Sequence, residues 1–141
     1  MIATVAVGVD ASATAGEAVK MAVELARRFD AELVLLSAYG KVDGAAPGHG
    51  GESEARWATD ASAVQREMVA RTEDRLREQG VRCSTLTGEG HPADVLVRLA
   101  DQCGADILVV GNKGMERRVL GSVPNTVTHK AGCSVLVVKT T

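Results

Sequence analysis

Aromatic residues are scarce in this sequence, which has one Trp, one Tyr and one Phe among 141 residues. Proteins that bind single-stranded nucleic acid usually stack the bases on aromatic side chains, so this scarcity argues against such a function. Charge of one sign is also not in excess, because 16 basic and 18 acidic residues give a formal net charge of −2. No global field is therefore expected to attract nucleic acid or an anionic membrane.

Cysteine is scarce as well, and no pair of cysteines is close in sequence. Cys83, Cys103 and Cys133 form no Cys-x-x-Cys motif, and no histidine lies at a metal-ligand spacing from them. These features argue against a zinc site and favour reduced thiols packed as small core residues. The beginning of the chain, "MIATVAVGVD", has neither a basic start nor a cleavage site, and no apolar run reaches transmembrane length. A cytoplasmic protein is expected.

What the sequence does contain is a regular alternation of strand-like and helix-like segments. Short apolar, β-branched runs predict buried parallel strands. Apolar residues at helical spacing predict amphipathic helices between them. The predicted strands cover residues 2–10, 31–39, 81–88, 105–111 and 133–140, and the predicted helices begin near Ser12 or Thr14, near Glu54, at Pro92 and at Ser122. A Gly-rich surface loop is predicted over residues 40–53.

The apolar spacing also predicts which face of each helix is buried. The predicted inner residues are Ala18, Met21, Ala22, Leu25 and Phe29 in the first helix, Trp57, Ala61, Val64, Met68 and Leu76 in the second, Val95, Leu96, Leu99 and Cys103 in the third, and Val123, Val127 and Ala131 in the fourth. On the outer side of the second helix, Glu73 and Arg77 are spaced for an i,i+4 ion pair.

Strand–helix alternation predicts an α/β fold with a parallel sheet and helices on both faces. We expect one domain, residues 1–141, with a five-stranded doubly wound sheet of order 3-2-1-4-5. In that order the winding reverses between the first and fourth strands, and ligands of open α/β sheets bind outside the strand carboxyl ends at this switch point. Asp10 follows the first strand and Gly111 ends the fourth.

The stretch "VVGNKGMERRVLGSVPNTV", residues 109–127, therefore falls where a crevice is expected. Gly111, Gly114 and Gly121 would permit positive φ angles and a close approach of the backbone. Ser122 would cap the following helix or turn toward an anion at the positive end of that helix. The cations Lys113, Arg117 and Arg118 suit phosphate, and Asp10 suits ribose hydroxyls or a divalent metal such as Mg²⁺.

This constellation predicts a nucleotide site, with phosphates at residues 111–122 and the sugar near residue 10. A plainer interpretation stays open at this point. Each glycine alone is more often a turn or a helix end, and the two adjacent arginines alone would be solvated loop charges.

Four segments resemble the universal stress protein family. They are "VGVDAS" after the first strand, "GHPADVL" at the third helix, "DILVVGNKGM" in the fourth strand, and "LGSVPNTVTHKAGCSVLVVKT" toward the end. The ATP-binding branch of that family carries the pattern G-x2-G-x9-G-[S/T]. Gly111, Gly114, Gly121 and Ser122 match its fixed positions.

The resemblance implies a fold like that of the adenine nucleotide alpha hydrolases, and ATP as ligand. It implies that Val9 and Asp10 flank the nucleoside and that the backbone of Ala38 meets the adenine. The same resemblance places Gly111, Gly114, Gly121, Ser122 and Val123 around the phosphates. One departure is the loop between Gly114 and Gly121, which has six residues where the family pattern has nine. AMP, ADP and cyclic AMP are therefore kept as alternative ligands.

The fifth strand, residues 134–139, lies at a sheet edge and is too apolar to be left exposed. Pairing with the same strand of a second copy would cover it, and the resemblance also implies such a homodimer. Overall, we expect a homodimeric, nucleotide-binding stress-response module rather than an efficient enzyme. The alternatives are a slow ATPase, which would need Asp10 to place a metal and His91 or His129 as base, and a dimerisation scaffold that has lost nucleotide binding.

Overall fold

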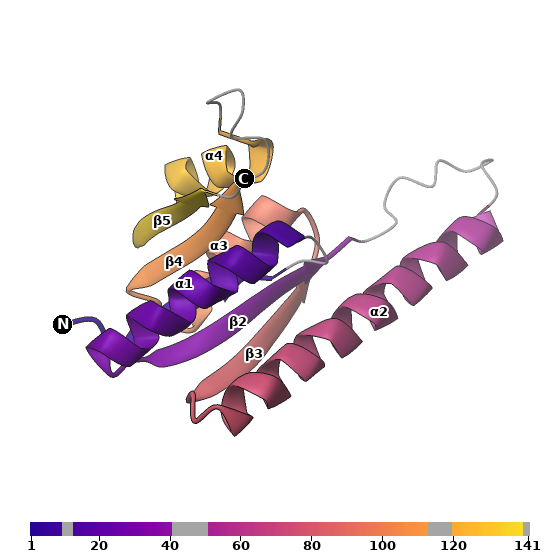
Figure 1. Cartoon of the computed structure of the whole chain (residues 1–141). Coiled ribbons are helices and arrows are strands. Elements are labelled where there is room, and N and C mark those ends of the chain that lie inside the picture. Colours follow the sequence, from indigo (N-terminus) through magenta and orange to yellow (C-terminus); the bar gives the residue numbers. More distant parts are fainter. Residues whose placement is uncertain (10–12, 41–50, 113–119, 140–141) are drawn as a thin grey trace.

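The computed structural model describes residues 1–9, 13–40, 51–112 and 120–139, and for residues 13–15 and 51–62 it describes the backbone alone. Strands and helices alternate along the chain (Figure 1). In chain order they are β1 Thr4–Gly8, α1 Ala13–Phe29, β2 Glu32–Tyr39, α2 Gly51–Glu78, β3 Cys83–Glu89, α3 Pro92–Gln102, β4 Ile107–Asn112, α4 Ser122–Lys130 and β5 Ser134–Lys139. Helix α2 begins three residues before the predicted start at Glu54, and residues 41–50 of the predicted loop lie outside the described residues.

The five strands form one sheet of order β3-β2-β1-β4-β5, and every neighbouring pair is parallel. This confirms the predicted α/β fold and strand order. β1 pairs with β2 from Thr4↔Glu32 and with β4 from Val5↔Ile107. The change of winding direction lies between β1 and β4, as predicted, so their carboxyl ends flank the switch point.

Helices cover both faces of the sheet (Figure 1), and each face has its own apolar cluster. On one face α1 and α2 bury the side chains of Val5, Val7, Leu33, Leu35 and Val109. On the other face α3 and α4 bury those of Ala6, Val34, Leu36, Leu108 and Val110. This alternation along each strand explains the near-continuous apolar runs in the sequence, because both faces of a parallel sheet are buried.

The predicted inner face was right for α3 and α4 and wrong in part for α1 and α2. In α3 the predicted Val95, Leu96 and Leu99 are buried. In α1 the buried set is Ala18, Val19, Ala22, Val23 and Ala26, whereas Met21 and Phe29 are 39% and 47% exposed. In α2 Val69 and Leu76 are buried, Val64 is 63% exposed, and the side chains of Trp57 and Ala61 lie outside the description. Helix α1 thus turns a strip of small residues to the sheet.

The amino ends of β1 and β4 are joined by the carboxylate of Asp106. Its Oδ2 accepts hydrogen bonds from the backbone N–H groups of Ala3 at 2.8 Å and Thr4 at 3.0 Å. These two bonds lower the pKa of Asp106 below its ordinary value. Asp106 therefore joins β1 to β4 at the amino ends of the strands, which is the end of the sheet opposite the switch point. It does so although it lies 102 residues from Thr4 along the chain.

An ion pair predicted on α2 is confirmed. Glu73 and Arg77 form the expected i,i+4 ion pair at 2.6 Å. The three cysteines are free thiols, and burial raises the pKa of each. No described helix is long and apolar enough to cross a membrane.

Candidate functional site

The carboxyl end of β1 leads directly to the predicted site residue Val9. The backbone N–H of Val9 donates to the carbonyl of Leu36 at 2.8 Å, and its side chain is 6% exposed in the cluster under α1 and α2. Val9 therefore extends the contact between β1 and β2, and its N–H and side chain are engaged within the protein. Asp10, the next predicted residue, lies outside the described residues.

The carboxyl end of β4 is tied to the start of α4 by Asn112, a residue that sequence reasoning missed. Asn112 pairs with Lys139 of β5, its side chain is fully buried, and its Oδ1 accepts the backbone N–H of Gly121 at 2.8 Å. A polar residue at the end of an apolar strand was the available signal. The bond fixes the N-terminus of α4 beside the end of β4, that is, at the switch point.

Gly121 and Ser122 begin α4 in a way that differs from the prediction. Gly121 is the N-cap, and Ser122 is the first helical residue, so the predicted capping role of Ser122 is wrong. The predicted positive φ is also wrong for Gly121, which has φ −62° and ψ 167°, a conformation open to any residue. Gly111 lies within β4, paired with Val138.

Room, rather than conformation, accounts for a glycine at 121. A Cβ at this position would lie 3.3 Å from Oδ1 of Asn112 and 3.6 Å from Cδ of Pro124. The exposed Ser122 and the half-buried Val123 follow on the first turn of α4. Because the first N–H groups of a helix have no partner within it, and because Pro124 has no N–H, the N–H groups of Ser122 and Val123 are the donors that this turn presents to an anion. Of the remaining predicted phosphate residues, Lys113 and Gly114 lie outside the described residues, as do Arg117 and Arg118.

Ala38, predicted to meet the adenine, lies near the end of β2 and has a hydrogen-bond partner that sequence reasoning did not identify. The side-chain Nε2 of Gln65, on α2, donates to the carbonyl oxygen of Ala38 at 2.8 Å and lies 2.7 Å from Oγ of Ser37. Ser37 is 1% exposed. Nothing in the helical periodicity of α2 singles out Gln65, because its role follows from a contact across 27 residues of sequence.

The two histidines considered as possible bases lie apart from the switch point. His129 is the last residue but one of α4, which begins at the carboxyl edge of the sheet and runs back toward the start of β5. It lies eight residues beyond Gly121, about 12 Å along the helix, and its neighbour Lys130 pairs with Asp94 in the first turn of α3 at 3.0 Å. His91 is the N-cap of α3, next to the edge strand β3. Among the described residues, no group of three or more His, Cys, Asp or Glu side chains could hold a metal ion.

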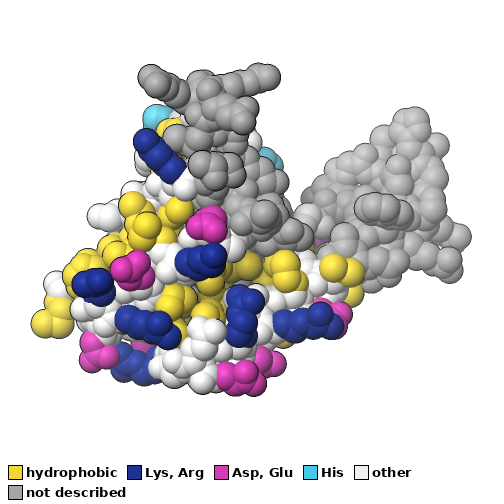
Figure 2. All heavy atoms as spheres, viewed as in Figure 1, with side chains coloured by type: hydrophobic (Ala, Val, Ile, Leu, Met, Phe, Trp, Pro, Cys, Tyr) yellow, Lys and Arg dark blue, Asp and Glu magenta, His cyan; other side chains and the backbone are white. Residues whose placement is uncertain are grey.

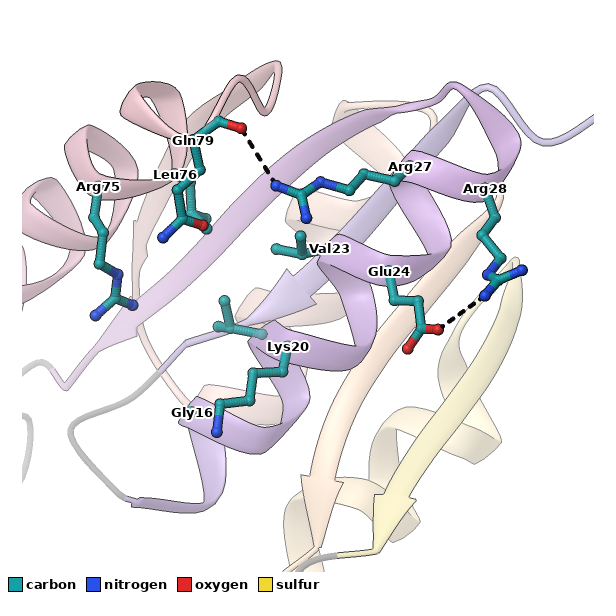
Figure 3. Close-up of a pocket in the computed structure, with 10 residues that line it drawn as sticks. Gly16, Lys20, Val23, Glu24, Arg27, Arg28, Arg75, Leu76 and Gln79 are labelled. Atoms are coloured by element: carbon teal, nitrogen blue, oxygen red, sulfur yellow. Dashed lines mark hydrogen bonds and ion pairs between the residues drawn. The ribbon is translucent and has the colours of Figure 1, made fainter.

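A groove between α1 and α2 provides a second concave surface (Figure 3). Val19, Val23 and Leu76 form part of its lining, and the basic residues along it are Lys20, Arg27, Arg28 and Arg75. Most of these cations are engaged within the protein. Arg28 pairs with Glu24, and Arg27 donates to the carbonyl of Gln79 (Figure 3). Lys20 pairs with Glu17. The groove also follows the helices rather than the strand carboxyl ends, so it is a poorer anion site than the start of α4.

Basic and acidic side chains are interspersed over the described part of the face that α1 and α2 form (Figure 2). Several belong to exposed pairs, such as Arg71 with Glu67 at 2.6 Å. The mixture agrees with the small net charge of the chain.

Comparison with known proteins places this site in context. Residues 1–139 match the model of the Universal stress protein family. Among curated proteins, universal stress protein Rv1636 of Mycobacterium tuberculosis is 36% identical, with 98% of this chain and 97% of the relative covered. Universal stress protein MJ0531 of Methanocaldococcus jannaschii is 34% identical, with 92% of this chain and 78% of the relative covered.

Solved structures include relatives with adenine compounds bound. A universal stress protein in complex with cAMP superposes with a TM-score of 0.75 at 30% identity and covers 99% of both chains. An Arabidopsis thaliana family member with AMP bound has a TM-score of 0.73 at 24% identity, covering 99% of this chain and 92% of the other. At that identity the second likeness shows the shared fold alone.

Proposed function

The chain belongs to the universal stress protein family, and on that premise we propose that it is an adenine-nucleotide-binding stress-response module. The ligand would lie at the switch point between β1 and β4. Its phosphates would lie against the first turn of α4 at Gly121, Ser122 and Val123, together with Gly111, Lys113 and Gly114. Its nucleoside would lie beside Val9, Asp10 and Ala38. We take residues 1–141 to be a single domain.

The observation that carries this proposal is the fixed start of α4. The Asn112–Gly121 hydrogen bond holds the helix N-terminus next to the end of β4. An anion at that point would meet backbone donors and the positive end of the helix macrodipole. Because the bond lies within the protein, the donors are in place before any ligand arrives, which reduces the ordering cost of binding.

The bound adenine compounds of related proteins support the choice of ligand class. The relative at 30% identity is in complex with cAMP. ATP is our first candidate, because Gly111, Gly114, Gly121 and Ser122 fit the ATP-binding pattern. AMP, ADP and cyclic AMP follow, because the loop between Gly114 and Gly121 is three residues shorter than that pattern. Asp10 is the carboxylate that would place Mg²⁺ with ATP.

The test is to identify what the purified protein carries and binds. Mass analysis of small molecules released by denaturation should detect an adenine nucleotide, and calorimetry should rank ATP, ADP, AMP and cyclic AMP. Absence of binding by all four at millimolar concentration would contradict the proposal and favour the ligand-free scaffold.

We further propose that the protein binds without efficient turnover. The position of His129, about 12 Å along α4 from Gly121, supports this, because a general base must reach the attacking water. Steady release of phosphate from ATP that depends on Asp10 would contradict it and favour the slow ATPase.

We propose a homodimer formed through β5, residues 134–139, in the cytoplasm. β5 is an edge strand in which Val135, Leu136 and Val137 are only half-buried within the single chain. A second copy pairing along this edge would cover both the backbone groups and the apolar side chains. The free thiols of the three cysteines agree with a reducing compartment.

A further inference from the structure

The carbonyl group of Ala38 points past the end of β1. The preceding carbonyl on the same side of β2 belongs to Leu36 and accepts the N–H of Val9. The Tyr39 carbonyl accepts the N–H of Gly90, on the β3 side. Backbone groups of a strand alternate between its two neighbours, so the Ala38 carbonyl faces the β1 side, one step beyond Val9. The Ala38 carbonyl oxygen therefore faces the switch point.

The side-chain amide of Gln65 lies in front of this oxygen. Its Nε2 lies 2.8 Å from the Ala38 oxygen and 2.7 Å from Oγ of Ser37. Because a carbonyl oxygen can only accept, the group that faces it must be the amide nitrogen, which fixes the orientation of the Gln65 side chain. Both N–H bonds of that nitrogen are thus directed at β2.

The 6-amino group of adenine is the same kind of donor as this amide, a planar NH₂ attached to a conjugated system. We propose that Gln65 competes with the adenine base for the Ala38 carbonyl, covering it in the free protein and yielding it when a nucleotide binds. This inference rests on the proposed function. It assigns to α2 a residue that lowers the affinity of a site built otherwise at the ends of β1, β2 and β4.

The exchange has a different outcome for different bases. Adenine replaces one donor to the Ala38 oxygen by another, so the cost of displacing Gln65 is largely offset. Hypoxanthine presents an acceptor at position 6, so its entry would leave the carbonyl facing a second oxygen, which is unfavourable. The Ala38 carbonyl would therefore favour adenine over hypoxanthine, and Gln65 would lower the affinity for both bases.

The test is the variant Gln65→Met, which keeps the length of the side chain and removes the donor. Binding of AMP, IMP and ribose 5-phosphate would be measured by calorimetry. We expect AMP to bind roughly three- to tenfold more tightly than to the wild type, since one hydrogen bond no longer has to be broken. IMP should gain by a similar factor, and ribose 5-phosphate, which has no base, should not change.

Two further variants complete the design. Gln79→Ala removes an exposed glutamine just beyond the end of α2 and should leave all three affinities unchanged. Ser37→Ala removes one of the two acceptors of the Gln65 amide and should tighten AMP binding by a smaller factor, which keeps the test available if Gln65→Met does not fold. In the wild type, the side-chain amide NMR signals of Gln65 should shift on saturation with AMP and stay in place with ribose 5-phosphate.

The outcomes separate the two proposals. If the wild type binds AMP and Gln65→Met binds it equally or more weakly, the competition is overturned and the nucleotide site stands. If neither protein binds AMP, the proposed function fails and the competition fails with it. Binding of AMP by Gln65→Met alone would support both.

Discussion

The buried carboxamide of Asn112 accepts the backbone N–H of Gly121 at 2.8 Å and thereby joins the end of β4 to the N-cap of α4. The two residues are nine positions apart and enclose the loop whose length departs from the family pattern. The start of α4 therefore has an anchor on β4 that does not depend on the length of that loop. Two predictions test this relationship.

Replacing Asn112 by alanine should destabilise the fold and weaken nucleotide binding. The Gly121 N–H would lose its partner in a half-buried place, which costs about 1–3 kcal/mol, and we expect this loss in the free energy of unfolding from urea denaturation. AMP affinity should fall roughly tenfold, because α4 is no longer held at the switch point. The control Asn125→Ala, at an exposed position of α4, should change the unfolding free energy by less than about 0.5 kcal/mol. Equal effects of the two changes would refute the anchoring role.

Replacing Gly121 by valine should weaken AMP binding about tenfold while the fold persists. The backbone angles of Gly121 suit valine, but its Cβ would lie 3.3 Å from Oδ1 of Asn112, and its methyl groups would occupy the space beside the first turn of α4. Calorimetry measures the affinity, and circular dichroism checks the fold. Gly16→Ala is the matched control, since among the described residues nothing outside its own helix turn lies within 4 Å of the added methyl group. Unaltered affinity in Gly121→Val would show that no ligand approaches this glycine.

Acid should destabilise the protein partly through Asp106. The N–H groups of Ala3 and Thr4 lower the pKa of Asp106 in the folded state. The stabilisation is therefore complete above the pKa of an unfolded aspartate, about 3.9, and is lost as the pH falls through the lower folded-state pKa. In melting experiments from about pH 6 to about pH 2, Asp106→Asn should be less stable than the wild type at the upper end and lose less stability on acidification.

Asp94→Asn is the control for this titration, because Lys130 lowers the pKa of Asp94 through an exposed hydrogen bond and ion pair. Its effect should fade in about 1 M salt, which screens surface charges. The Asp106 effect comes chiefly from hydrogen bonds to backbone groups and should largely persist. An Asp106→Asn protein with the same acid transition as the wild type would argue against this account.

A charge on β5 should dissociate the proposed dimer. Leu136 and Val137 are half-buried against the two opposite apolar clusters of the single chain. Leu136→Glu and Val137→Glu would each place a carboxylate at the covered edge, and sedimentation should shift from dimer toward monomer. Thr87→Glu adds the same charge at an exposed position of β3, at the other edge of the sheet, and should leave the dimer intact. A dimer that survives both β5 variants would place the interface elsewhere.

The fold could be predicted because parallel strands that are buried on both faces leave a strong signal. Runs such as residues 31–39 and 105–111 are too short for helices and too apolar for one-sided strands. The inner face of α1 could not be predicted as well. The large apolar side chains of Met21 and Phe29 suggested burial, but close packing on the sheet selects the small residues Ala18, Ala22 and Ala26.

The arrangement of the elements around the candidate site was predicted, but some of the side chains that hold this arrangement were not. The strand order placed the ends of β1 and β4 and the start of α4 together, as the structure confirms. Asn112 and Gln65 were missed because each acts through a contact between elements distant in sequence, and local patterns carry no record of such a contact. The role of Gly121 was wrongly assigned to φ, because a sequence does not distinguish a glycine needed for space from one needed for conformation.

The central position of β1 has a consequence for synthesis on the ribosome. β1 is translated first, and both of its faces are apolar and end up buried, yet one of its two partners, β4, begins only at Ile107. Until that residue has left the exit tunnel, the backbone N–H and C=O groups on one side of β1 have no partner strand. Such an edge invites mispairing with other chains, so β1 is protected on both sides only after the segment that begins at Ile107 has been made.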